Sequence, residues 1–300
     1  MTIFRLIKKN AVFDTILLVV MLFVSFATLY PFYYCFIYSL STPLEMAKHR
    51  AFFLPVGFTL ENYRVVFRNP LIMPAFFISV ARTLSGVIYT CLMTGVASYA
   101  LTKRSLPGRR YISLFLMLPM YVNGGMIAHY VNTVQLGLYN NVLVYVLPAG
   151  FATYYMLIMR TFFMSLPDSL EESARLDGAS EMTVFLRIII PISMPIFATV
   201  ALFAGVSQWN SWFDAMIYII DRSKHPLQNI LQDILRMRSN NAATLLKQVQ
   251  NANPNQRRSP VTPESIQMAT LIITTVPIVM VYPFLQRYFI KGIMIGAVKA

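Results

Sequence analysis

An unbroken run of 30 residues without an acidic, basic or histidine side chain, 15–44, limits what this chain can fold into more than any other feature. About 20 apolar residues suffice for a helix to cross the roughly 30 Å hydrocarbon core of a bilayer. Only 12% of the residues are charged, against about 25% in an average soluble domain. Five further uncharged runs reach or nearly reach spanning length: 83–102, 111–128, 130–159, 188–213 and 265–286. We therefore predict an all-α, polytopic membrane protein with six transmembrane helices.

The distribution of basic residues predicts which loops face the cytoplasm. Lys103, Arg104, Arg109 and Arg110 crowd the short turn after the second run, whereas the turn at 135–141 has no Lys or Arg. Short loops rich in Lys and Arg stay inside, so we expect the first turn and both termini in the cytoplasm. The net charge of +13 is thus explained by topology, and nucleic acid is not an expected partner.

We predict one transmembrane domain over 1–300. Its non-membrane pieces would be external loops at about 43–70 and 221–264, a cytoplasmic loop at about 166–191 and a cytoplasmic tail at 288–300. The basic residues of 221–264 argue against an external position for this loop, but the charge of a long loop is weak evidence of topology. Their surplus suits an acidic glycan or an acidic binding protein, or else is a solvated face. The first part of this loop has helical apolar spacing at Ile230, Leu231, Ile234 and Leu235.

The polar stretch "LEESARLDGASEMTVFLRIIIPISMP" interrupts the hydrophobic sequence at 170–195. Ser169 and Glu172 have the spacing of a capping box, which predicts a helix start. Gly178 suits a left-handed turn that ends this helix, and Ser180 can cap a second helix. That helix has an apolar face formed by Phe185, Ile188 and Ile189. The stretch therefore predicts a compact two-helix knob on the cytoplasmic side.

This spacing resembles the cytoplasmic loop of binding-protein-dependent ABC importer permeases. Their pattern is Glu-Ala-Ala, three residues, Gly, nine residues, Ile, one residue and Leu-Pro. This chain has the same spacing, with Ser173 and Ile190 as the departures, in Glu172, Ser173, Ala174, Gly178, Ile188, Ile190 and Pro191. "STPLEM", "FTLENYRVVF", "SYALTKRSLPGRR", "QWNSWFDAM" and "QRYFIKGIMIGAVKA" look like the maltose-type subgroup that imports oligosaccharides and polysaccharides. Ala128 stands where that subgroup would have proline.

The resemblance implies a type I importer permease, a multi-pass protein of the bacterial cytoplasmic (inner) membrane and not an enzyme. It implies these partners: a second homologous permease, two ATPase subunits, an extracytoplasmic solute-binding protein, a carbohydrate substrate and membrane lipid. ATP and Mg would be held by the ATPase subunits, with no cofactor bound by this chain. The knob would dock in an ATPase cleft and couple it to the helices through Glu172, Ser173, Ala174, Asp177 and Gly178. The end of the chain, 290–300, would reach between the ATPases or be a frayed terminus.

Candidate residues for a substrate pathway gather near the fifth run. Indole rings stack on sugars and amides or carboxylates bind hydroxyls, but tryptophan also favours the membrane interface. Charges within spans usually face a cavity or a partner, and whether Arg82 and Asp214 pair is open at this stage. Asn123 and its two glycines could form a break in the third run, and close helix packing there is at least as strongly expected. The candidates are Arg82, Asn123, Trp209, Asn210, Trp212 and Asp214.

Other classes of protein have less support in the sequence. The three histidines have no metal-ligand spacing, and Cys35 and Cys91 suit buried apolar positions. No phosphate-binding GxxxxGK[ST] segment occurs, so this chain would not hydrolyse ATP. An ion-coupled secondary transporter would need intramembrane carboxylates, for which only Asp214 is a candidate. A membrane enzyme would need a catalytic constellation, and none is visible.

Overall fold

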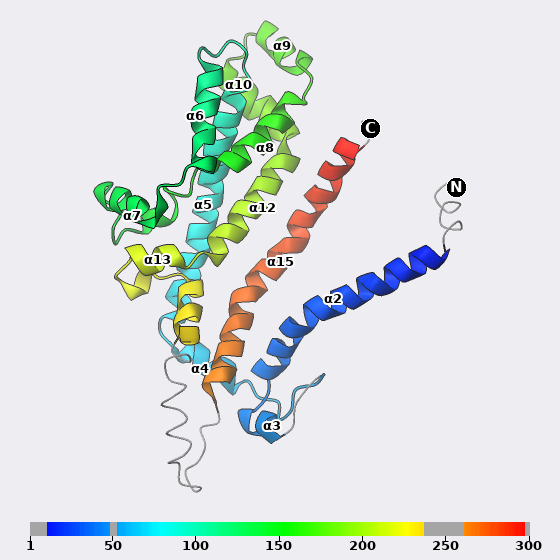
Figure 1. Ribbon diagram of the computed structural model, residues 1–300, viewed down its shortest axis with the longest axis vertical. Coiled ribbons are helices and arrows are strands. Elements are labelled where there is room, and N and C mark those ends of the chain that lie inside the picture. Colours follow the sequence, from blue (N-terminus) through cyan, green and yellow to red (C-terminus); the bar gives the residue numbers. More distant parts are fainter. Residues whose placement is uncertain (1–10, 49–52, 237–260, 298–300) are drawn as a thin grey trace. The chain divides into compact units, whose positions relative to one another are not determined.

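The computed structural model describes residues 11–48, 53–236 and 261–297, and these are mostly helical (Figure 1). These residues fall into two compact units: the first holds the described residues up to 69 and those of 234–275, and the second holds 70–233 and the described residues from 276 on. Within the described residues the strand-like structure is a single antiparallel bridge between Ser41 and Phe58. The all-α prediction is therefore confirmed. The side chains of the predicted tail 288–300 lie outside the described residues.

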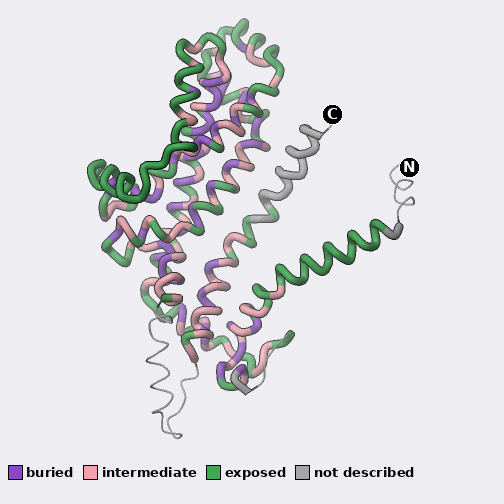
Figure 2. Tube along the Cα trace, viewed as in Figure 1, coloured by how far each residue is buried: buried purple, intermediate pink, exposed green. Residues whose placement is uncertain are grey.

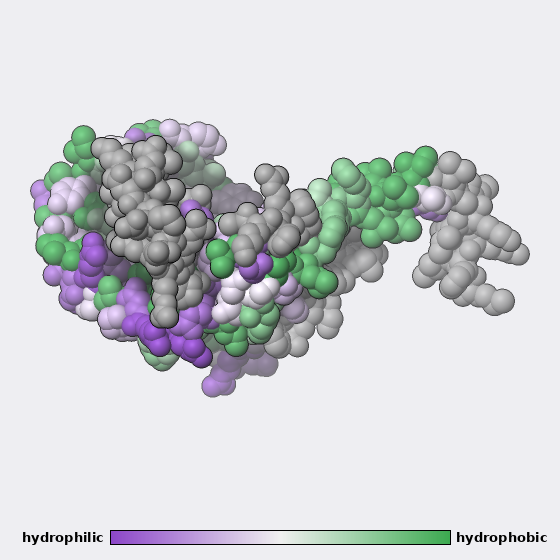
Figure 3. Space-filling model, turned by 90° about the horizontal axis from the view of Figure 1, so that it is seen from below, coloured by the Kyte–Doolittle hydropathy of each residue, from purple (hydrophilic) through white to green (hydrophobic). Residues whose placement is uncertain are grey.

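The first unit contains a long apolar helix and a small polar anchor at its end. Its helices are α2 (Ala11–Ser39), α3 (Pro43–Lys48), α4 (Glu61–Arg68) and the first part of α15 (Pro263–Ala297). Hydrophobic side chains cover α2 and most of them are exposed (Figures 2 and 3). Asn62 of α4 is buried and donates to the carbonyls of Ser39 (2.8 Å) and Ser41 (3.1 Å). A helix with this surface requires a lipid or protein environment.

The second unit is organised around α5, which packs mainly against α12 and α8. A buried cluster in this unit includes Tyr99, Met159, Val184 and Val200, and it joins the bundle to the polar loop. The helices of the unit, in chain order, are α5 (Ile72–Ala100), α6 (Arg109–Tyr121), α7 (Gly125–Gln135), η1 (Val142–Tyr145), α8 (Thr153–Met164), α9 (Ser169–Leu176), α10 (Glu181–Val184), the π-helical η2 (Phe185–Ile189), α11 (Ile190–Ile192), α12 (Met194–Asn210), α13 (Phe213–Tyr218), η3 (Arg222–Lys224) and a helix that begins at 227.

Three helices of the described chain are long and apolar enough to cross a membrane: Phe13–Ser39, Ile72–Ala100 and Pro263–Val281. Two bent helix pairs raise this to five if each pair is one span. The prediction that 130–159 is one spanning helix is wrong. Helix α7 ends at Gln135, and an irregular segment with η1 precedes α8. The run was identified only because it has no charged residue, and this does not show whether its backbone is continuous. The backbone turns at Gly137, which has a φ of +70°.

The bends lie where the sequence contains helix-breaking residues. Helices α6 and α7 meet at 119°. Of the two alternatives left open around Asn123, the structure has the break, since Gly125 has a φ of +75° and its amide donates to the Asn123 side chain (2.9 Å). The helix ending at Ile192 and α12 meet at 81°, between Pro191 and Pro195. Proline cannot donate the backbone hydrogen bond that would continue a straight helix.

Candidate functional site

The predicted two-helix loop is present, and it turns at Gly178 between α9 and α10. Gly178 has a φ of +80°. Its amide donates to the Arg175 carbonyl and the Ala179 amide to the Ala174 carbonyl, both at 3.0 Å. This pair of hydrogen bonds is the Schellman helix ending. A Cβ at Gly178 would meet no atom within 4 Å. Glycine is therefore favoured here by the positive φ and not by crowding, and the space beside the turn is open.

The start of α9 differs from the prediction. Its N-cap is Asp168, which has helical backbone angles and makes no side-chain capping bond. The predicted capping box of Ser169 and Glu172 is therefore wrong. The amides of Glu171 and Glu172 both donate to the Asp168 carbonyl (3.1 Å), so the backbone already satisfies amides that a cap would serve. The second cap is confirmed, because Ser180 Oγ accepts from the amide three residues on (3.3 Å).

Five side chains, here called the loop anchor, join the end of α5 to both helices of the loop: Tyr99, Lys103, Glu171, Arg175 and Glu181. Lys103 Nζ contacts Glu171 Oε2 and lies 3.1 Å from Glu181 Oε2. Arg175 Nη2 bridges Glu171 Oε2 (3.3 Å) and Glu181 Oε1 (2.7 Å). Lys103 Nζ also donates to Tyr99 Oη (2.6 Å) and lies 3.9 Å from the ring centroid of Tyr99. Charged groups at these distances fix the orientation of the loop more than an isolated surface pair would.

Glu181 has a pKa below its ordinary value for a reason visible in the loop anchor. Burial acts to raise the pKa of this carboxyl, but the hydrogen bond and charge of Lys103, the Tyr99 hydroxyl and the charge of Arg175 together lower it. The roles of these residues in the loop were not predicted from the sequence. Glu171, Arg175 and Glu181 lie within seven residues of the predicted turn at Gly178 and were a usable signal, whereas Lys103 comes from a distant segment of the chain.

Most of the predicted coupling residues form an open surface. Ala174 is 9% exposed and packs in the cluster that includes Phe163 and Phe185. The other four are exposed: Glu172, Ser173, Asp177 and Gly178. Leu176 lies beside them and is 89% exposed. An apolar side chain this exposed on a polar loop is typical of a protein contact surface.

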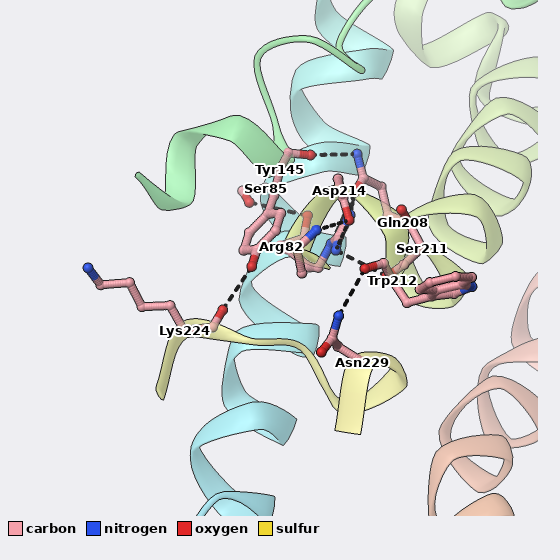
Figure 4. Close-up of polar contacts among 10 residues, drawn as sticks. Arg82, Ser85, Tyr145, Gln208, Ser211, Trp212, Asp214, Lys224 and Asn229 are labelled. Atoms are coloured by element: carbon pink, nitrogen blue, oxygen red, sulfur yellow. Dashed lines mark hydrogen bonds and ion pairs between the residues drawn. The ribbon is translucent and has the colours of Figure 1, made fainter. Parts of the chain in front are cut away.

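A second polar site surrounds Arg82, which is 3% exposed in the middle of α5 (Figure 4). Its guanidinium makes a two-pronged ion pair with Asp214, at 2.6 Å (Nη2 to Oδ2) and 3.2 Å (Nη1 to Oδ1). It also donates to Gln208 Oε1 from Nε (3.3 Å) and Nη2 (3.1 Å), and to the Ser211 carbonyl (3.2 Å). The guanidinium carbon lies 4.3 Å from the ring centroid of Tyr145. The pairing that the sequence left open is therefore present.

Further hydrogen bonds extend this network to the neighbouring loops. Gln208 Nε2 donates to the Tyr145 carbonyl (3.0 Å), and Tyr145 Oη donates to the Lys224 carbonyl (2.9 Å). Asn229 Nδ2 donates to the Trp212 carbonyl (3.1 Å) (Figure 4). The network thus ties η1, η3 and the helix at 227 to the point where α12 ends and α13 begins. Gln208 and Tyr145 were not predicted, although polar groups within uncharged runs are a usable signal.

A glycine makes room for this network. A Cβ on Gly86 would lie 2.8 Å from the side-chain amide of Gln208. Real Cβ atoms do not approach other atoms so closely, so a larger residue at position 86 would displace the Gln208 side chain from this network. The close approach in turn brings Gln208 within reach of Arg82, one turn away on α5.

The predicted pathway residues do not meet in one place. Trp209 is 6% exposed and packs edge-on against Phe76, with ring centroids 6.3 Å apart. It borders a recess of about 400 Å³ lined by apolar groups, including Leu84 and Leu202. Asn210 is exposed at the end of α12, and Trp212 and Asp214 follow that end instead of lying within the span. Asn123 is exposed at the break between α6 and α7, apart from the Arg82 network.

The helix predicted at the start of loop 221–264 is present. Residues 227–236 are helical, and Ile230 and Leu231 are 7% and 8% exposed. The part of the loop that carries most of its basic residues, 237–260, lies outside the described residues. No set of three His, Cys, Asp or Glu within the described ranges is placed to hold a metal ion, and Cys35 and Cys91 are free thiols.

Comparisons with known proteins agree in their result. Residues 86–295 match the family described as binding-protein-dependent transport system inner membrane component. Protein LplC of Bacillus subtilis is 36% identical over 97% of this chain and 96% of its own length. The polygalacturonan/rhamnogalacturonan transport system permease YtcP of Bacillus subtilis is 30% identical over 97% of this chain and 99% of its own.

Solved structures give the same architecture. A chain of a bacterial ABC transporter involved in the import of the acidic polysaccharide alginate is 28% identical, with a TM-score of 0.81 over 94% of this chain and 98% of that one. A chain of a bacterial alginate ABC transporter in complex with an alginate pentasaccharide-bound periplasmic protein is 14% identical, with a TM-score of 0.57. This second likeness shows the fold alone.

Proposed function

Because the chain belongs to the family of binding-protein-dependent transport system inner membrane components, a family of ABC transporter permeases and not of enzymes, we propose that it carries an acidic oligosaccharide or polysaccharide into the cell. The observation that supports this most is its likeness, over nearly its whole length, to the alginate importer chain and to the polygalacturonan/rhamnogalacturonan permease YtcP. Family membership also removes the secondary transporter and the membrane enzyme as alternatives.

The proposed assembly contains a second homologous permease, two ATPase subunits with their ATP and Mg, and an extracytoplasmic binding protein. The chain would lie in the bacterial cytoplasmic membrane with both termini inside. The family description, a binding-protein-dependent transport system, supports the last of these partners. The basic turn that carries Lys103 and the loop of α9 and α10 lie together in the loop anchor, as expected if both face the cytoplasm.

The exposed surface around Leu176 is the proposed ATPase docking site. Glu172 would pair with a basic group of the ATPase, and Leu176 would enter an apolar pocket beside it. Substitution Leu176→Glu should weaken retention of the ATPase subunits about tenfold, since one buried apolar anchor contributes about 1 to 2 kcal/mol or more. Leu60→Glu, at a 55% exposed leucine before α4, is the matched control. Equal retention of the ATPase by wild type and Leu176→Glu would reject this docking site.

A substrate pathway near the end of α12 also remains a proposal. The exposed amide of Asn210 and the half-buried Trp212 offer hydrogen bonds and a stacking surface for a sugar ring. Arg82 and Asp214 would hold the backbone of this segment in place, Trp209 would support it by packing, and Asn123 would act at the break between α6 and α7.

Uptake by the reconstituted transporter tests the function directly. The complete complex is placed in liposomes with ATP inside and binding protein outside, and uptake of labelled alginate or galacturonan oligosaccharides is measured against neutral malto-oligosaccharides. We expect ATP-dependent uptake of the acidic series. Preferential uptake of the neutral series would reject the acidic class, and uptake without ATPase subunits would reject the mechanism.

A further inference from the structure

Three arginines meet at one end of α6 and α8 in a recess of about 450 Å³. We call it the arginine recess, and its lining is Arg109, Arg110, Ser113, Leu114, Met117 and Arg160. The two helices are antiparallel, and Thr153 Oγ1 of α8 donates to the Leu116 carbonyl of α6 (2.8 Å). Arg109 lies two helical turns before Leu116 in α6, and Arg160 lies two helical turns after Thr153 in α8. Because the helices are antiparallel, this spacing places the two charges side by side.

Two buried polar atoms of residues that line the arginine recess have no hydrogen-bond partner. Ser113 is 8% exposed, and its Oγ makes no hydrogen bond. Arg160 Nε is buried and likewise makes none. Buried polar atoms are normally satisfied, and an unsatisfied one points to a missing ligand or water. Both atoms can donate a hydrogen bond, so together they suit an anion with several acceptor oxygens.

Within the described ranges the three arginines of the arginine recess have no ion-pair partner, whereas Lys103 and Arg175 nearby are paired in the loop anchor. Arg109 donates to the Thr102 carbonyl (3.3 Å) and also borders acidic side chains in a second recess. Arg109 and Arg110 also open helix α6, which lacks both an acidic residue in its first turn and a capping side chain. Cations at a helix start oppose the helix dipole, whereas an anion there is favourable.

We propose that the arginine recess binds the headgroup phosphate of an anionic phospholipid in the cytoplasmic leaflet. The phosphate oxygens would accept from the arginines and from Ser113. The acyl chains would lie along the apolar side of α6, where Leu114 (57%), Phe115 (71%) and Leu118 (50%) are exposed. Basic pockets between transmembrane helices on the cytoplasmic side have the chemistry that recognises such lipids.

The combination of a polar and an apolar part distinguishes a lipid from other anions. Free phosphate would use the arginines but leave the apolar face beneath them uncovered. An amphiphile with one negative headgroup satisfies both parts at once, and Tyr111, which is 78% exposed beside Arg110, is of the residue type that favours the headgroup level.

The test measures how strongly the purified transporter complex, in detergent micelles, binds labelled phosphatidylglycerol and phosphatidylcholine. Wild type should prefer phosphatidylglycerol. Near a membrane surface each arginine contributes an affinity factor of about 5, so Arg110→Gln with Arg160→Gln should lower phosphatidylglycerol binding about 25-fold. Arg104→Gln removes a charge from the same turn without touching the arginine recess, and should bind as wild type. Ser113→Ala, which keeps every charge, should lower binding by a smaller factor.

Several outcomes would overturn the proposal. One is equal binding of the two lipids by wild type, and another is an unchanged lipid preference in the double variant. Competition by inorganic phosphate at concentrations equal to the lipid would assign the site to free phosphate instead. Arg110→Lys with Arg160→Lys keeps the charges and should retain most of the preference, so a double Gln variant that fails to assemble does not decide the matter.

Discussion

At the scale of single residues, substitution of Gly178 can distinguish simple backbone strain from a role in coupling ATP hydrolysis to transport. An alanine at its φ of +80° should cost about 1 to 2 kcal/mol of local stability. We expect Gly178→Ala to reduce transport per ATP hydrolysed while the permease stays in the membrane. Gly108→Ala is the matched control, because Gly108 also has a positive φ of +69° and open space around it. Both variants should lower the unfolding temperature slightly. If transport per ATP also fell equally in both, the special role of the loop glycine would be wrong.

Loss of the Asp214 carboxylate should lower the stability of the protein strongly. Asp214→Asn removes the charge that balances Arg82, which is 3% exposed. An uncompensated buried charge costs about 3 to 5 kcal/mol. Thermal unfolding of the purified complex should therefore shift strongly downward. The double variant Arg82→Met with Asp214→Leu should be more stable than Asp214→Asn, because no charge is then left unpaired. Equal stabilities of wild type and Asp214→Asn would show that the pair contributes nothing.

At this scale the sequence predicted features that depend on neighbouring residues and missed those that depend on contacts with distant segments. The left-handed turn at Gly178 follows from the glycine itself, and the prediction is confirmed. The capping box failed because the backbone of Asp168 already accepts the amides that the Ser169 hydroxyl would have accepted. The partners of Arg82 come from segments far along the chain, so their pairing with it was not readable from sequence spacing.

At the scale of elements, the loop anchor should hold α9 and α10 against the end of α5. Lys103→Met removes the ammonium that joins Glu171 and Glu181, which leaves two carboxylates near each other. We expect faster amide hydrogen exchange over 166–184 and lower transport per ATP, with little change in the rest of the bundle. Arg104→Met, at an exposed neighbour, should leave exchange in this loop unchanged. Exchange that does not differ between the two variants would show that the loop is held by apolar packing alone.

The pKa of Glu181 gives the same element a pH dependence. Its pKa in the folded loop is below the ordinary value of 4.5, so its contribution to stability is fully present above about pH 4.5 and is lost as pH falls through the folded value. The protection of the loop amides, measured as the exchange rate relative to the intrinsic rate at each pH, should therefore decrease in acid below that pH. Glu181→Gln should remove this part of the acid response, and an identical acid response in the variant would contradict the assignment.

Sequence patterns predicted helix type well and helix continuity poorly. Charge-free runs identify apolar segments, but they do not show where the backbone turns within one, as it does at Gly137 and between Pro191 and Pro195. The break at Asn123 was an open alternative because glycines serve both bends and close packing. The π-helical segment η2 had no sequence signal, although such segments are frequent at functional positions.

At the scale of the whole molecule, the second unit contains a direct structural connection between the loop anchor and the Arg82 network. Helix α5 takes part in both polar sites: Tyr99 belongs to the loop anchor, and Arg82 holds the junction of α12 and α13. About 26 Å of helix separates these two residues at 1.5 Å per residue. A continuous helix is stiff over this length, so movement of the loop by an ATPase would be transmitted along α5 to the proposed pathway. A rigid α5 is then a requirement for coupling.

This requirement can be tested by softening α5 between its two anchored ends. Ile88 and Leu92 lie between them and are 59% and 50% exposed, so Ile88→Gly with Leu92→Gly leaves both polar sites intact and costs about 1 kcal/mol of helix stability per glycine. We expect ATP hydrolysis to continue while transport per ATP falls. The same pair of changes in α2, Val19→Gly with Phe23→Gly, removes comparable exposed apolar groups from a helix of the first unit and should leave transport per ATP unchanged. If both pairs behaved alike, force would have to reach the pathway by another helix, and α12, which packs along α5, would be the next to test.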